Sequence, residues 1–210
     1  MKNVCLMVLS LLILPAISAL AQYERVAGYH EHDGFFLRFH AGAGSGKMVE
    51  TDIPISDLTL TGMSGVFRFQ IGGSIASNLI LFGELGAFSM SDPDIDYGEY
   101  TQAYADIELS ITDYGVGLTY YFMPSNIYVS GTLTFSKNRL SIRAMDVTGE
   151  TEMGYGGYLS AGKEWWVSGD WALGVAGFYY FSEVTDKAND GTEYPVSNSV
   201  VGIVFSATYQ

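Results

Sequence analysis

The sequence predicts an all-β protein, an eight-stranded antiparallel up-and-down transmembrane β-barrel with a side-chain-filled lumen. Apolar and small or polar residues alternate with period two in eight segments, each of about nine to eleven residues, the length that a tilted membrane strand needs. The connections between these segments are alternately long and short. After Gln22, no apolar run approaches the ~18 residues that indicate a membrane helix.

The N-terminus has the pattern of a cleaved signal peptide. Lys2 precedes an apolar run over 4–14, and Ala19-Leu20-Ala21 forms an A-x-A cleavage pattern. We therefore expect a signal peptide over 1–21, a short N-terminal segment over 22–33 and the barrel over 34–210. The single cysteine, Cys5, would leave with the signal, so neither a disulfide framework nor a cysteine-based zinc site is expected.

The first strand is expected from Gly34 onward, where Phe35, Leu37 and Phe39 alternate with Arg38 and His40. The same pattern defines seven further strands, expected at Gly65–Gly73, Leu79–Phe88, Asp113–Phe122, Ile127–Ser136, Tyr155–Trp165, Trp171–Phe181 and Val200–Tyr209. Their apolar sets include, in order, Phe67 and Phe69; Leu81 and Leu85; Val116 and Leu118; Val129 and Leu133; Leu159 and Ala161; Leu173 and Val175; Ile203 and Phe205.

The connections predict how the strands are arranged. Long connections are expected near 46–64, 89–112, 137–154 and 183–199, and short ones at 74–78, 123–126 and 167–170. The short ones are rich in the Gly, Pro, Ser and Asn of tight turns. In an up-and-down barrel this order places every long loop at one end and every turn at the other.

The distribution of charge predicts that the apolar set faces lipid. The other set of each strand is mostly Gly, Ser, Thr, Ala and Tyr, with few charges, whereas a surface exposed to water is normally far more charged. Lys163, in the apolar set, lies beside Trp165 at a strand end, where it can reach the interface. Aromatic residues at the turn end are typical of an interfacial girdle; they include Tyr120, Phe122, Trp165, Trp166, Trp171 and Tyr209.

From Gly34 to Tyr209 the chain resembles the small eight-stranded outer-membrane β-barrels of Gram-negative bacteria, the group of outer membrane protein X and the barrel domain of outer membrane protein A. The resemblance rests on the signal, on the segment from Ile71-Gly72-Gly73 to Gly83-Glu84-Leu85-Gly86, on Gly162-Lys163-Glu164-Trp165-Trp166, and on the last strand. It implies an integral protein with extracellular long loops and periplasmic turns. It also implies an assembly signal for the barrel-assembly machinery at Gly202, Phe205, Ala207 and Tyr209, although here Gln210 follows the aromatic residue.

Charged residues expected inside the barrel need partners there. If the 74–78 turn centres on Ala76, Arg68 lies directly opposite Glu84. We predict a structural ion-pair network of Arg38, Arg68 and Glu84, extending to His40 and Glu164. An eight-stranded barrel is only wide enough for side chains to fill, which favours this interpretation over an ion pathway.

The loops suggest contacts with the outer-membrane lipids. The segment 91–110 has six acidic residues and no basic one. A solvated loop is the ordinary interpretation, and weak cation binding by Asp92, Asp94 and Asp96 near anionic lipopolysaccharide is the alternative. Lys137, Arg139 and Arg143 could instead contact lipid phosphates directly.

The sequence gives little support for phosphate, calcium, metal or nucleic-acid binding. Ala41–Lys47 departs from the phosphate-binding loop, since its first glycine is Ala41 and Met48 replaces Ser/Thr. Tyr97 occupies the glycine position of an EF-hand loop. The His30–Asp33 segment lacks further ligands for a metal site. We expect no metal and no cofactor, and the acidic chain, with a formal charge of −13, argues against nucleic acid.

The sequence therefore predicts a non-enzymatic outer-membrane protein in envelope structure, surface adhesion or defence, acting through acidic extracellular loops, with an extracellular partner that the sequence does not identify. Two alternatives stay open. One is a lipid-A-modifying enzyme that uses His40, for which no convincing Ser or acid partner is visible. The other is a soluble lipid-binding barrel, with its apolar face turned inward.

Overall fold

The computed structural model describes residues 32–51, 57–97, 100–103, 106–142, 145–188 and 190–210. Its long strands are β1 (Phe35–Glu50), β2 (Leu58–Ala76), β3 (Leu79–Ser91), β6 (Ile107–Phe122), β7 (Ile127–Ile142), β9 (Gly154–Trp166), β10 (Trp171–Lys187) and β11 (Glu193–Tyr209). The short strands are β4 (Asp94–Tyr97), β5 (Tyr100–Ala103) and β8 (Val147–Glu150). The expected signal peptide over 1–21 and most of the expected N-terminal segment lie outside the described residues.

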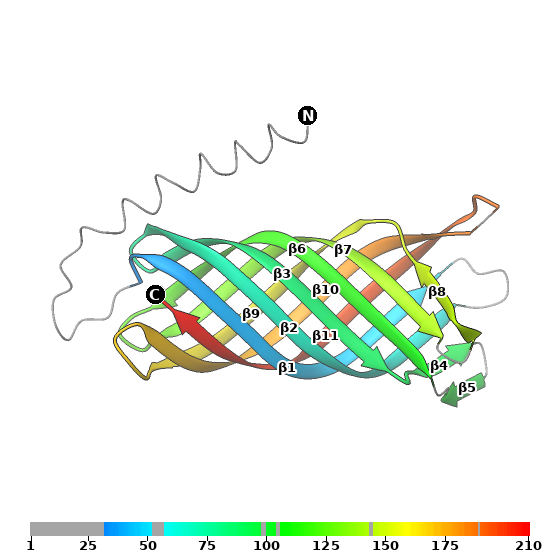
Figure 1. Cartoon of the computed structure of the whole chain (residues 1–210), viewed down its shortest axis with the longest axis horizontal. Coiled ribbons are helices and arrows are strands. Elements are labelled where there is room, and N and C mark those ends of the chain that lie inside the picture. Colours follow the sequence, from blue (N-terminus) through cyan, green and yellow to red (C-terminus); the bar gives the residue numbers. More distant parts are fainter. Residues whose placement is uncertain (1–31, 52–56, 98–99, 104–105, 143–144, 189) are drawn as a thin grey trace.

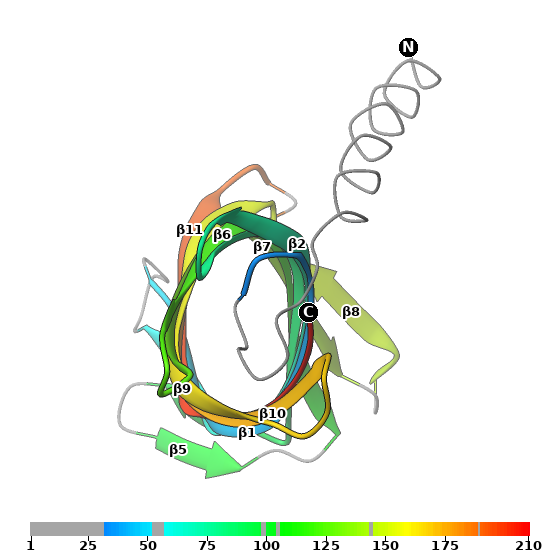
Figure 2. The same ribbon diagram turned by 90° about the vertical axis from the view of Figure 1, so that its left-hand side faces the viewer.

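The eight long strands form a closed antiparallel barrel, as predicted. Their order around the barrel is β1-β11-β10-β9-β7-β6-β3-β2, and β2 returns to pair with β1. At this closure, Phe39 of β1 lies opposite Phe69 of β2 on one side and Ala207 of β11 on the other. Figure 2 shows the ring from its end. Closure pairs the backbone groups of the wall with one another, which is the condition for crossing hydrocarbon with strands.

The two ends of the barrel differ. One end, here called the turn end, carries the C-terminus and the short connections at 77–78, 123–126 and 167–170; the other, the loop end, carries β4, β5 and β8 (Figure 1). The β4–β5 hairpin extends β2, and β8 extends β7. Viewed along the barrel, β5 and β8 lie outside the ring (Figure 2).

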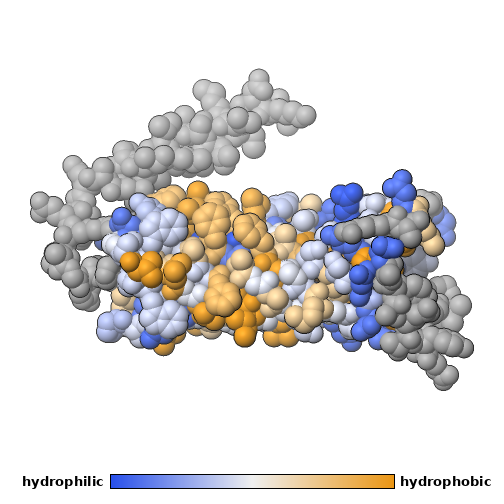
Figure 3. All heavy atoms as spheres, turned by 60° about the horizontal axis from the view of Figure 1, so that its bottom comes forward, coloured by the Kyte–Doolittle hydropathy of each residue, from blue (hydrophilic) through white to orange (hydrophobic). Residues whose placement is uncertain are grey.

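An apolar belt surrounds the middle of the barrel. On β2 it is formed by Met63, Phe67, Ile71 and Ile75, whose side chains are 69%, 53%, 47% and 58% exposed. Twelve residue steps from Met63 to Ile75, at about 3.3 Å each and a tilt of about 40°, give about 30 Å, the thickness of a hydrocarbon core. Figure 3 shows apolar residues over the middle and hydrophilic ones toward the loop end. An outward belt of this kind contradicts the soluble-barrel alternative.

No helix in the described part of the chain is long and apolar enough to cross a membrane.

The long strands extend beyond their predicted ends. β2 begins at Leu58 rather than Gly65, and β1 continues to Glu50, so part of the long connection expected over 46–64 is strand. The reason is a reversal of polarity at the loop end, where Met48 and Leu60 are buried and Lys47 is exposed. The alternation that marks a lipid-facing strand therefore stops before the strand does.

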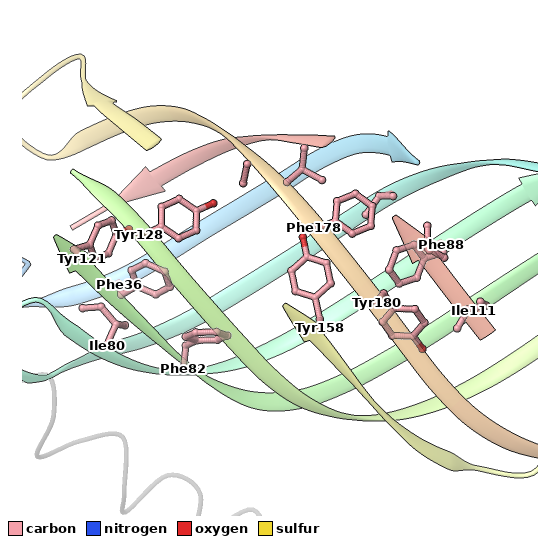
Figure 4. Packing of buried hydrophobic residues seen from close by; sticks show 14 residues of the cluster. Phe36, Ile80, Phe82, Phe88, Ile111, Tyr121, Tyr128, Tyr158, Phe178 and Tyr180 are labelled. Carbon is pink, nitrogen blue, oxygen red and sulfur yellow. The ribbon is translucent and has the colours of Figure 1, made fainter. Parts of the chain in front are cut away.

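Buried side chains fill the lumen. Aromatic and aliphatic residues from several strands point inward (Figure 4), including Phe36, Phe82, Phe88, Tyr121, Tyr128, Tyr158, Phe178 and Tyr180. Charged and polar residues lie among them and form the clusters described next. Gly86 makes room for one of these charges, since a Cβ there would lie 2.6 Å from the guanidinium carbon of Arg68.

Candidate functional site

The middle of the lumen holds a central cluster of Arg68, Gln70, Glu84 and Asp113. Arg68 Nη2 lies 2.5 Å from Glu84 Oε1 and 2.5 Å from Asp113 Oδ1, and Arg68 Nη1 donates to Asp113 Oδ2 at 3.2 Å. Gln70 Nε2 donates to Glu84 Oε2 at 2.5 Å. All four side chains are buried, and the single guanidinium group of Arg68 pairs with both carboxylates.

The register that we expected for this cluster is wrong by two residues. Glu84 lies opposite Gln70, and Arg68 lies opposite Gly86, because the turn is centred at 77–78 and not at Ala76, and a one-residue shift between Ser74 and Ala76 offsets only part of this difference. Arg68 still reaches Glu84 diagonally across the two strands. Arginine is long enough for such a diagonal contact between neighbouring strands.

A second group, the turn-end cluster, contains Arg38, Tyr121, Glu164 and Thr208. Arg38 Nε lies 3.2 Å from Glu164 Oε1, and its Nη2 donates to Tyr121 Oη. Tyr121 Oη donates to Glu164 Oε2 at 2.9 Å, and Thr208 Oγ1 donates to Glu164 Oε1 at 2.7 Å. Four of the five residues predicted as one network therefore lie in these two clusters, and Gln70 joins the clusters, since Arg38 Nη1 donates to Gln70 Oε1 at 3.4 Å.

His40 joins neither ion pair. Its side chain is fully buried, and Nε2 lies 3.3 Å from Tyr128 Oη. Arg68 lies opposite His40 in the β1–β2 pairing, and Arg38 lies two residues before it on β1. Each arginine lies above an aromatic ring: Tyr128 at 4.2 Å from the Arg38 guanidinium carbon and Tyr158 at 4.0 Å from that of Arg68. The imidazole is enclosed by protein and faces away from lipid.

Asp113 and Tyr121 were missed as members of these clusters. Asp113 supplies two of the oxygens that face Arg68, and Tyr121 links Arg38 to Glu164. Asp113 belongs to the polar set of its predicted strand, so the alternation already indicated that it points inward. Tyr121 stands out only as one of three consecutive aromatic residues, and nothing local in the sequence indicates its partners.

The loop end of the lumen is closed by apolar residues. Met48, Leu60, Met90, Leu109, Val184 and Val196 pack together there and are buried. At the level of Met48, which lies opposite Asn198, Asn138 and Asn198 exchange amide hydrogen bonds of 2.9 and 3.1 Å. A cavity lined by Met48, Met90 and Asn198, among others, has a volume of only about 10 Å³, room for about one water molecule. The lumen therefore holds no space for a metabolite there.

At the turn end, aromatic side chains face outward around the barrel. Tyr120, Phe122, Trp165 and Trp171 are 39–53% exposed, and the Trp171 ring lies 5.4 Å from that of Tyr209. Lys163 Nζ lies 5.7 Å from the Trp165 ring. Trp166 differs from the other predicted girdle residues, since its ring lies 5.4 Å from that of His32, a buried residue. Of the expected assembly signal, Phe205 is exposed on β11, while Gly202 packs its backbone against β1.

The outer surface at the loop end carries charged side chains beside exposed apolar ones such as Met145 and Val147. Lys137 Nζ lies 2.6 Å from Glu150 Oε2, with the two side chains 39% and 47% exposed. The hydrogen bond from Lys137 lowers the pKa of the Glu150 carboxyl. Arg139 lies opposite Glu150 in the β7–β8 pairing and is exposed. Arg143 lies outside the described residues.

The acidic segment gives no ready-made cation site. Asp92 precedes β4, which contains Asp94 and Asp96, and Asp92 has a φ of 49° at the bend into that strand. Among the residues that the structure describes, no three His, Cys, Asp or Glu side chains are grouped so that they could hold a metal ion. Cation binding by these three aspartates remains only a hypothesis.

Comparison with solved structures identifies the fold. Neisserial surface protein A is similar over 86% of this chain and 99% of its own, at 12% identity and a TM-score of 0.56. The chain has the fold of the small outer-membrane β-barrels. Less similar are the outer membrane protein AlkL, with 12% identity over 90% of this chain and 95% of its own (TM-score 0.47), and the protease OmpT of Escherichia coli, with 10% identity over 87% and 99% (TM-score 0.40). No protein-family model and no curated protein sequence matches.

The belt and the fold together define the location. A closed barrel with an apolar outside and a polar, filled inside is stable only where lipid covers the belt. The protein is an integral β-barrel of the bacterial outer membrane.

Proposed function

We propose that the protein is a non-enzymatic anchor that presents its loop end at the cell surface, in envelope structure, adhesion or defence. The observation that carries the proposal is the filled lumen. Its charges pair with one another, and apolar residues close its loop end. A barrel filled in this way offers no route for a solute, so its chemistry lies on its surface.

The proposed orientation places the loop end outside the cell and the turn end in the periplasm. The β4–β5 hairpin and β8 would then extend beyond the membrane, with Asp94, Asp96 and Glu150 among their acidic residues. Protease added to intact cells tests the orientation. Cleavage by trypsin after Lys187, whose side chain is 49% exposed at the loop end of β10, is expected in intact cells. Cleavage there only after lysis would reverse the proposed orientation.

Adhesion is tested by removing the hairpin while keeping the barrel. A variant in which 94–103 is replaced by a short turn should retain outer-membrane recovery and heat-dependent gel migration, since the wall strands remain paired. Loss of binding to host surfaces or of survival in serum, with the barrel intact, supports the proposal. Unchanged binding and survival would contradict a role for this hairpin.

Outer-membrane lipopolysaccharide is the proposed lipid partner. Lys137 and Arg139 point outward on β7, on the loop-end side of Phe135, which is 55% exposed in the belt. Guanidinium and ammonium groups at this level can reach lipid phosphates. Lys137→Glu with Arg139→Glu should weaken lipopolysaccharide association. Lys187→Glu, which breaks an exposed pair with Glu193 at the tip of the β10–β11 hairpin, is the matched control, and association insensitive to salt and EDTA would contradict the proposal.

The enzymatic alternative lacks an accessible catalytic group. His40 is enclosed in the lumen beside Tyr128, so a lipid substrate in the membrane cannot reach it without opening the wall. A lipid A mass spectrum that is unchanged by deletion of the protein is expected. A change in that spectrum would revive the alternative.

A further inference from the structure

A single cation lies on the outward face of β9 near the turn end. Lys163 is in the last part of this strand, which leads into the 167–170 turn (Figure 1), and its side chain is exposed. It belongs to the same outward set as Ala161 and Trp165. The ammonium group therefore faces the membrane, whereas the charged groups of the two clusters face the lumen.

The protein surface around Lys163 offers no acidic partner. In the strand pairing Lys163 lies opposite Ile127 of β7 and Val175 of β10, whose side chains are 44% and 38% exposed. Its Nζ lies 5.7 Å from the ring centroid of Trp165, close enough for a cation–π interaction. Among the residues that the structure describes, Lys163 forms no ion pair. Its three N–H donors therefore point to a partner outside the protein.

The depth of Lys163 in the membrane follows from its register with β7. Ile127, the first residue of β7, is paired with Lys163, so the two differ in height by only about 3 Å. Lys137, on the same strand, is the outward cation at the loop-end edge of the belt. From Ile127 to Lys137, residue steps of about 3.3 Å at a tilt of about 40° give about 25 Å, the height of the apolar band of such barrels. The outward residues between them are apolar or glycine: Val129, Gly131, Leu133 and Phe135. Lys137 and Lys163 thus mark the two edges of the hydrocarbon.

We propose that Lys163 and Trp165 form a binding site for the phosphate of an anionic glycerophospholipid in the leaflet at the turn end. An ammonium group at the edge of the hydrocarbon lies within reach of lipid phosphates, with which it forms charge-assisted hydrogen bonds. The Trp165 ring, 53% exposed beside it, is of the amphipathic kind enriched at the level of the headgroups. The site depends on the position of the belt, and neither on a role in adhesion nor on which end of the barrel is extracellular.

The charge of Lys163 selects an anionic lipid over a zwitterionic one. A zwitterionic headgroup carries its own cation beside the phosphate, and this cation competes with the lysine, whereas phosphatidylglycerol carries none. A basic residue at a membrane surface gives a preference of about 5-fold for anionic lipid. The chain as a whole has a formal charge of −13, which repels anionic lipid. A preference for such lipid would therefore come from a local cation and not from the net charge.

Quenching of tryptophan fluorescence by brominated lipids measures this preference. The full chain is placed in phosphatidylcholine bilayers that contain a minor fraction of phosphatidylglycerol, in phosphate-free buffer, with bromine on the acyl chains of one lipid or the other. Trp171→Phe serves as the background, because Trp171 is also exposed and Trp165 reports on the site. Phosphatidylglycerol should occupy the site about 5-fold more often than its share of the bilayer. Occupancy in proportion to that share would overturn the proposal, whatever the variants show.

Three variants in the same background assign the preference to Lys163. Lys163→Gln, which keeps a polar side chain without the charge, should remove the preference, and Lys163→Arg should retain it. Lys187→Gln is the matched control, because it removes the same charge at the loop-end tip of β10, and it should behave like the background protein. An unchanged preference in Lys163→Gln, or an equal loss in Lys187→Gln, would overturn the proposal. Heat-dependent gel migration verifies that each variant is folded.

Solid-state NMR tests the contact itself. Dipolar coupling is measured between isotope-labelled lysine ammonium nitrogens and lipid phosphorus in frozen bilayers of the same composition, again without free phosphate. The ammonium signal that disappears in Lys163→Gln should show phosphorus at hydrogen-bond distance, and the signal that disappears in Lys187→Gln should not. Absence of phosphorus near the Lys163 ammonium would show that water alone surrounds it and would overturn the proposal.

Discussion

Removing Arg68 should destabilise the barrel far more than removing an exposed cation. Its guanidinium group faces two carboxylates at 2.5 Å, those of Glu84 and Asp113, and all three side chains are fully buried. Arg68→Leu leaves both carboxylates enclosed without a cation. Breaking a buried ion pair by removing one partner costs about 3–5 kcal/mol, and the contact of Arg68 with the Tyr158 ring is lost as well. We expect Arg68→Leu to lower the free energy of unfolding by an amount at or above the upper end of that range.

The matched control is Lys137→Leu, which breaks a pair of nearly the same length, 2.6 Å, whose side chains are 39% and 47% exposed. Exposed pairs contribute about 0–1 kcal/mol, so the free energy of unfolding should hardly change. Glu84→Gln should fall between the two, at about 1–3 kcal/mol, because Arg68 keeps its two contacts with Asp113.

Urea unfolding of the barrel in lipid vesicles, followed by tryptophan fluorescence, measures these differences, and heat-dependent gel migration verifies that each variant starts folded. The double variant Arg68→Leu/Glu84→Gln should lose less unfolding free energy than the sum of the losses in the two single variants, since one of the two buried carboxylates left without a cation is removed. If Arg68→Leu costs no more than Lys137→Leu, the central cluster does not stabilise the barrel, and the reasoning from buried charge is refuted.

Three further outcomes are expected. Gly86→Ala should destabilise the barrel by about 1–3 kcal/mol, because the added carbon meets a buried guanidinium at 2.6 Å, whereas Gly83→Ala, whose nearest atoms lie at 4.0 Å, should be neutral in the same unfolding assay. Tyr121→Phe should cost about 1–3 kcal/mol by removing the hydroxyl that donates to a buried carboxylate at 2.9 Å; a neutral result would argue that water replaces it. Lys137→Met should raise the pKa of Glu150, measured by carboxyl NMR, since Lys137 lowers it. Any stability from this pair is therefore present above the ordinary glutamate pKa and lost as the pH falls through the lowered value.

Local patterns in the sequence predict the barrel but not its internal partners. Alternation gives all eight wall strands and places Arg38, Arg68 and Glu164 on the inward side, because lipid and lumen demand opposite polarities on the two faces. The partners of Arg68 across the wall depend on the turn at 77–78 and on the shift between Ser74 and Ala76. The exact turn position and a one-residue irregularity at the end of a strand leave no periodic signal.

The environment of His32 could not be predicted from spacing. Its side-chain partners Asn126 and Gln210 are 94 and 178 residues away in the chain, and only closure of the barrel brings them together. Likewise, the alternation identifies only the part of each strand that faces lipid, and it misses the part that extends beyond the membrane. At Lys47 and Met48 the polarities of the two faces exchange, so the strand continues beyond the belt without the alternation of a lipid-facing strand.

The change from apolar to charged outward residues at the loop end of the belt fixes the depth of the barrel in the bilayer. Outward charges lie just beyond the belt on separate sides of the barrel, with Lys47 on β1, Arg139 on β7 and Glu183 on β10. Sinking the barrel by two residues, about 5 Å along the membrane normal at a tilt of about 40°, would carry all of them toward hydrocarbon. The cost of a lipid-facing cation rises from about 0–1 kcal/mol near the interface to about 2–4 kcal/mol at the midplane. Lifting it would expose Trp165 and Trp171 of the opposite rim to the lipid interior. The outward charges at the loop end therefore oppose movement of the barrel in one direction, and the aromatic residues at the turn end oppose movement in the other. The tips of the loop-end hairpins are thus held at a fixed distance from the membrane surface.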